Sequence, residues 1–84
     1  MEPTRRFHSE IRRLVASVGP VLTIAERQEV LHLLDHGEPV EALRTFAWVI
    51  SHKHAKLEAD LMSEWKRLAQ GAIDAAHLPP SFAL

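Results

Sequence analysis

The chain has 84 residues, of which 46% are hydrophobic and three are glycine, and its formal net charge is −1. A chain of this length can form one hydrophobic core but is too short to enclose a large buried active site as well. Its composition is too apolar for a disordered chain. The near-neutral charge argues against a general nucleic-acid binder, and the lack of cysteine excludes disulfides and thiol chemistry. No apolar run approaches the ~20 residues of a membrane span, and no signal peptide is recognisable. We therefore expect one cytoplasmic domain over residues 1–84.

Helical periodicity dominates the first half of the chain. Apolar residues at helical spacing predict a first helix over residues 4–18, which the following Gly-Pro pair ends. The four arginines of this segment flank its apolar stripe. Their position is explained if their methylene groups pack along the buried stripe while the guanidinium groups stay in water. Thr23 followed by Glu26 matches a capping box, so a second helix should begin directly after Thr23. Gly37 can take the left-handed conformation that ends this helix.

The second half predicts two more helices and a tail. Pro39 favours the first turn of a third helix over residues 39–52, whose apolar side chains cover about half of its circumference, so it should be the central helix. A fourth helix is predicted over residues 56–70, with a tight turn and a kink both open at its start. Residues 72–84 contain a helix-breaking Pro-Pro pair and are predicted to form an extended tail, with packing back onto the bundle left open.

These segments together predict an all-α fold, a compact antiparallel bundle of about four helices. So short a connection around Gly37 favours antiparallel packing of the second and third helices. The residues expected in the core are Phe46, Ile50, Leu61 and Trp65.

Six histidines raise the question of a metal site. Glu29, His32 and His36 share the polar face of the second helix, and a glutamate three residues before a histidine is a spacing used in carboxylate-bridged bundle sites. Such sites project into the core from several helices, whereas this face should meet water. His52 and His54 are two positions apart and point to different sides of a helix. We therefore predict no bound metal and no other cofactor.

Catalysis and DNA recognition fit the sequence less well than protein binding. No serine lies in a Gly-x-Ser-x-Gly elbow, so an enzyme is not expected. The second and third helices imitate a helix-turn-helix, but Glu38 and Glu41 stand at the helix end that should approach phosphates. A DNA-binding regulator remains an alternative function. Another is a structural subunit that self-associates through Trp48 and the apolar tail.

Acidic residues concentrate around the central turn. Residues 23–42 hold five acids against one arginine, a local charge of −4. The helix dipole accounts for Glu38 and Glu41 at a helix N-terminus, whereas Asp35 falls in the last turn of its helix, where an acid is disfavoured by ~0.3–1 kcal/mol. Two interpretations of Asp35 stay open. Either its carboxylate caps the start of the next helix, or it serves a partner.

Trp48 falls on the polar arc of the third helix, together with Glu41 and His52. An exposed tryptophan amid charges is typical of an interface anchor. The alternative is that the C-terminal tail or the first helix covers it. The predicted partner-binding surface combines this aromatic residue with the acids around the turn: Glu29, Asp35, Glu38, Glu41 and Trp48.

The central turn also carries a motif, which consists of an apolar pair, Asp, any residue and Gly-Glu, then three residues before Ala and an apolar residue. Here it is Leu33-Leu34-Asp35-His36-Gly37-Glu38 with Ala42-Leu43. Over residues 23–71 the chain resembles the small MafI-type immunity proteins of bacterial polymorphic toxin systems. It departs from them at Pro39, where the family often has Tyr, and at Ser51-His52-Lys53-His54, where the third helix commonly ends in acids.

The resemblance implies a function rather than a catalytic site. It implies an inhibitor encoded beside its toxin that acts by stoichiometric binding and has no catalytic residues. The expected partner is a protein toxin with a basic surface, often a nuclease, which an acidic surface would attract at long range. The two departures concern the partner surface more than the fold.

Overall fold

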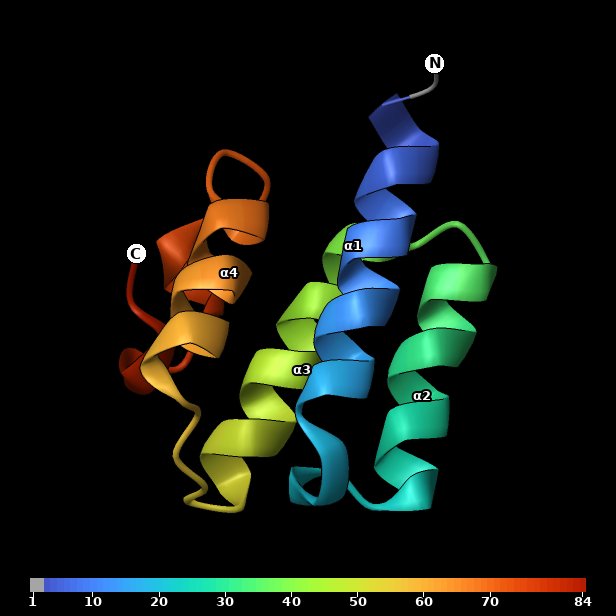
Figure 1. Ribbon diagram of the computed structural model, residues 1–84. Coiled ribbons are helices and arrows are strands. Elements are labelled where there is room, and N and C mark those ends of the chain that lie inside the picture. Colours follow the sequence, from blue (N-terminus) through green and yellow to red (C-terminus); the bar gives the residue numbers. More distant parts are fainter. Residues whose placement is uncertain (1–2) are drawn as a thin grey trace.

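The framework of the molecule is a set of four α-helices. The computed structural model describes residues 3–84, so Met1 and Glu2 of the predicted domain lie outside the described part. The helices are α1 (Pro3–Ser17), α2 (Ile24–Asp35), α3 (Pro39–His52) and α4 (Ala59–Ala69). Consecutive helices run in opposite directions (Figure 1), and the described residues contain no strand. The prediction of an all-α antiparallel bundle is confirmed.

The ends of α2 follow local sequence rules. The Thr23 hydroxyl accepts a hydrogen bond from the backbone N–H of Glu26 at 3.1 Å, and the Glu26 carboxylate accepts from the Thr23 N–H at 2.8 Å, which completes the predicted capping box. Gly37 has a φ of +76°, in the left-handed region that favours glycine. The N–H of Glu38 then returns to the carbonyl of Leu33 at 2.9 Å, which makes this end a Schellman motif.

The junction between α3 and α4 is a turn rather than a kink. His54 takes a φ of +54°, and the N–H of Ala55 donates to the carbonyl of Ile50 at 3.2 Å, so a left-handed residue ends α3 without a glycine. Residues 55–58 are irregular, and α4 begins at Ala59, three residues later than predicted. In the part of the chain that the structure describes, no helix is long and apolar enough to cross a membrane.

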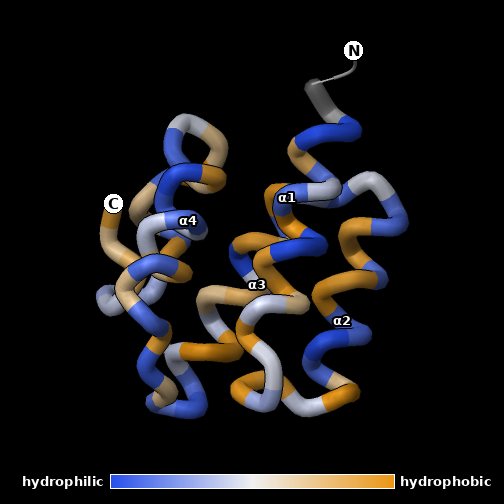
Figure 2. Tube along the Cα trace, in the orientation of Figure 1, coloured by the Kyte–Doolittle hydropathy of each residue, from blue (hydrophilic) through white to orange (hydrophobic). Residues whose placement is uncertain are grey.

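Helices α1 and α3 each contact the other three, and α3 holds five buried residues, so α3 occupies the predicted central position. Hydrophobic and hydrophilic residues follow one another along each helix (Figure 2), as is typical of amphipathic helices. Phe46, Ile50 and Trp65 lie in the core, as predicted. Leu61 is only partly buried and packs against the edge of the core, because it stands in the first turn of α4.

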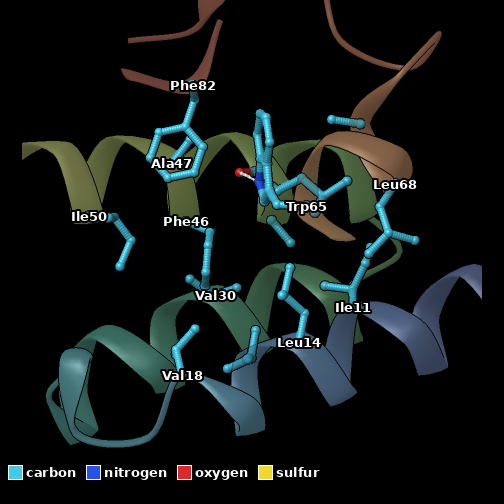
Figure 3. Close-up of a cluster of buried hydrophobic side chains, with 14 of the residues drawn as sticks. Ile11, Leu14, Val18, Val30, Phe46, Ala47, Ile50, Trp65, Leu68 and Phe82 are labelled. Carbon is cyan, nitrogen blue, oxygen red and sulfur yellow. Dashed lines mark hydrogen bonds between the residues drawn. The ribbon is translucent and has the colours of Figure 1, made fainter. Parts of the chain in front are cut away.

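The C-terminal tail packs back onto the bundle in two short 3-10 turns, η2 (Ala75–His77) and η3 (Pro80–Phe82), rather than as a continuous extended chain. The side chain of Phe82 is fully buried. Its ring meets Trp65 at a centroid distance of 4.8 Å and Phe46 at 6.5 Å, both edge to face (Figure 3). Residues of the tail therefore complete the core. A third 3-10 turn, η1 (Gly19–Val21), links α1 to α2.

Candidate functional site

Trp48 lies on the outer side of α3 and is 39% exposed. Its indole N–H donates to the carbonyl of His77 in the tail at 2.9 Å, and its ring lies 5.9 Å from that of His52 between centroids. The tail therefore covers Trp48 only in part, because it reaches the indole nitrogen while much of the side chain stays accessible. A partner that covers this ring would bury no unpaired donor, which removes a common penalty of burying tryptophan.

Two of the predicted acids lie at the N-terminal end of α3, the helix that carries Trp48. Glu41 is seven residues, or about two helical turns, before Trp48, so both share one side of α3. Its carboxylate forms an ion pair with Arg44. Glu38 is the N-cap residue of α3 and is exposed, and its side chain makes no capping hydrogen bond.

The acids of α2 point away from one another. Glu29 and Asp35 are both exposed, but six residues of helix separate them by about 120° around the axis. The Asp35 carboxylate accepts from the guanidinium of Arg12 on α1, a pairing that neither interpretation of Asp35 anticipated. The predicted surface is therefore not one continuous face. Asp35 is directed towards α1, whereas Glu41 and Trp48 belong to the outer side of α3.

His32 and His36 lie together on α2, with ring centroids 4.1 Å apart. The Nδ1 atom of His36 is 2.9 Å from the backbone carbonyl of His32, and since a carbonyl can only accept, this nitrogen carries the hydrogen. Within residues 3–84 no group of three or more His, Asp or Glu side chains is placed to hold a metal ion.

The structure also reveals a charged hollow of about 450 Å³ between α1 and α4, which the sequence did not predict. We call it the α1–α4 hollow; its lining residues are Arg6, Ser9, Glu10, Arg13, Glu64 and Arg67.

A chain of ion pairs crosses this hollow. Arg67 donates from Nε and Nη2 to the two carboxylate oxygens of Glu64 at 3.1 and 2.6 Å, and from Nη2 also to Glu10. Arg6 donates from Nε to the other oxygen of Glu10 at 3.1 Å. The hydrogen bonds from Arg67 are the main cause that lowers the pKa of both glutamates, and they raise the pKa of Arg67 in return. Both carboxylates are therefore ionised at neutral pH.

Only the residues that α1 contributes to this hollow could be recognised from the sequence. The arginines of α1 form a visible cluster in the sequence, and Glu10 lies between them, four residues after Arg6 and three before Arg13. The residue of α4 that binds Glu10 is Arg67, which is 57 residues further along the chain. Only the packing of α1 against α4 brings the two sets together.

Comparison of the chain with protein-family models, with curated proteins and with solved structures gives no match. A function must therefore be argued from the geometry of the surface and from the motif at the central turn.

Proposed function

We propose that this protein is a binding module that neutralises a cognate bacterial toxin in the cytoplasm by forming a stoichiometric complex with it. The observation that carries the proposal is the setting of Trp48. Its side chain is 39% exposed on a polar side of α3 while its N–H is bonded within the molecule. The motif shared with MafI-type immunity proteins supports a toxin as the partner.

In this proposal Trp48 and the acids have different roles. The tryptophan is the anchor that the partner desolvates, and such residues dominate the dissociation rate. Glu38 and Glu41 at the start of α3, together with the exposed Glu29 on α2, supply negative charge that steers a basic surface into contact and so acts on the association rate. Asp35 belongs to the predicted surface as well, but its charge is already shared with Arg12.

The test begins with the neighbouring gene. If it encodes a large secreted protein with a variable C-terminal domain, that domain is purified and its binding to this chain is measured by surface plasmon resonance. Trp48→Ala should weaken binding by at least ~2 kcal/mol, chiefly through faster dissociation, with the fold kept. Ile24→Ala is the matched control, because Ile24 is 73% exposed at the start of α2 and outside the surface.

The acids are tested in the same assay. Glu38→Gln and Glu41→Gln should slow association, and the effect should fade as salt rises. Glu58→Gln removes an equivalent exposed charge from the segment before α4 and should leave the rate unchanged. The proposal fails if the neighbouring domain does not bind. It also fails if Trp48→Ala unfolds the chain while affinity per folded molecule stays intact.

A further inference from the structure

The open hydrogen-bonding capacity of the α1–α4 hollow consists mainly of donors. Each of the four carboxylate oxygens of Glu10 and Glu64 already accepts from a guanidinium. Within residues 3–84, by contrast, neither the Arg13 guanidinium nor the Ser9 hydroxyl forms a side-chain hydrogen bond, although both line the hollow; Arg13 acts on Glu64 through its charge alone. Among the described residues Arg6 donates from its Nε, to Glu10, and its two terminal nitrogens form no further bond there. A ligand for this hollow must therefore bring acceptors.

The charge of the hollow limits what that ligand can be. Three arginines and two ionised glutamates line it, which leaves an excess of one positive charge. One carboxylate balances this excess and can accept two parallel N–H bonds from a guanidinium. A polyanion such as a nucleic acid would instead place further phosphates against Glu10 and Glu64, since its charges are closely spaced along the chain.

We propose that the α1–α4 hollow is a docking site for an acidic side chain of a protein partner, with Arg13, Arg6 and Ser9 as the donors. All three donors lie on α1, and the ion-pair chain through Arg67 links α1 to α4 across the hollow. The planar guanidinium of Arg13 can donate two parallel N–H bonds to one carboxylate. None of these residues belongs to the surface around Trp48, so this second site does not rest on the function proposed above.

The experiment uses the full chain, labelled with ¹⁵N, and a blocked peptide of alternating aspartate and glycine as the probe. The same peptide with asparagine in place of aspartate, inorganic phosphate and a single-stranded oligonucleotide are added in parallel. We expect the aspartate peptide to shift the amide and guanidinium signals of residues 6–13 and of Arg67, and to leave the Trp48 indole signal in place. The asparagine peptide should shift none of them, because it lacks the charge.

Two variants that each remove one positive charge distinguish binding at the hollow from a general electrostatic attraction to the protein. Arg13→Gln should lower the affinity for the aspartate peptide by at least about fivefold, because it removes a charge-assisted pair of bonds. It should melt close to the wild-type temperature, since within residues 3–84 the exposed Arg13 guanidinium forms no hydrogen bond and loses only a solvent-screened attraction to Glu64. Lys66→Gln removes an exposed charge from α4 outside the hollow and should change the affinity by less than about twofold.

Four results would overturn the proposal. They are the absence of any shift, shifts spread over all basic residues, equal losses in the two variants, and tighter binding of phosphate or of the oligonucleotide at the same residues. The last result would assign the hollow to phosphate groups instead of carboxylates.

Discussion

Phe82 offers the sharpest test of how the tail belongs to the fold. It lies two residues before Leu84, the last residue of the sequence, yet its side chain is fully buried against the aromatic rings of Trp65 and Phe46. Phe82→Ala would empty this volume at the point where the tail meets α3 and α4. The tail would lose its largest buried side chain, and two core rings would lose an edge-to-face neighbour.

The expected cost is large for a domain of this size. Replacing a buried phenylalanine by alanine costs ~3–5 kcal/mol. A chain of 84 residues has a total stability of about 4–13 kcal/mol, so the change removes a quarter or more of it. We expect a fall in melting temperature of at least about 12 °C, at ~4 °C per kcal/mol. Phe82→Leu keeps part of the volume and should cost about 1–2 kcal/mol, which guards against a variant that does not fold.

The assay is urea unfolding followed by circular dichroism, together with a thermal melt. Leu84→Ala is the matched control, because Leu84 lies two residues further along the same tail and is 50% exposed. Its cost should stay below about 1 kcal/mol. If Phe82→Ala costs no more than this control, the tail does not pack onto the core as described, and the argument from its burial is wrong.

Three further predictions concern single interactions. The pKa of Glu26 is lowered mainly by its hydrogen bond from Lys53, so its contribution to stability is complete at neutral pH and is lost as the pH falls below the ordinary value of 4.5 and through the folded-state pKa. Glu26→Gln should therefore flatten the fall in melting temperature between pH 6 and about pH 3. A double-mutant cycle of Arg12→Gln and Asp35→Asn should give a coupling below about 1 kcal/mol that vanishes in high salt, since both side chains are about half exposed; a larger, salt-independent coupling would contradict this. Gly37→Ala should cost about 1–2 kcal/mol in urea unfolding from its left-handed backbone alone, because a Cβ at this position meets nothing within 4 Å. Gly37→Asn should cost less, and equal costs for Ala and Asn would refute the backbone argument.

The features that the sequence predicted well are those that depend on neighbours along the chain. A capping box needs only Thr23 and Glu26, and a left-handed helix end needs only Gly37. The central position of α3 followed from the width of its apolar face, which is a property of one helix. Local stereochemistry acts over three or four residues, so these features can be recognised in the amino-acid sequence.

The features that the sequence missed depend on which helices meet. Nothing near Asp35 indicates that its partner is Arg12, because the two are 23 residues apart. The α1–α4 hollow needs the register between α1 and α4, which no local rule supplies. His54 ends α3 in a left-handed conformation, which no glycine at this junction indicates. Leu61 was placed on the correct stripe, but its burial depends on what covers the first turn of α4.

The tail connects the core to the surface around Trp48. Phe82 holds the tail from inside, and the carbonyl of His77 in the same tail accepts the indole N–H of Trp48 from outside. Release of the tail would therefore leave the indole N–H without its internal acceptor and free the ring to reorient. By linkage, a partner that binds Trp48 in its observed orientation must stabilise the docked tail by the same free energy that the docked tail adds to binding. Trp48 and the C-terminal part of the core are thus energetically coupled, although Trp48 and Phe82 are 34 residues apart in the sequence.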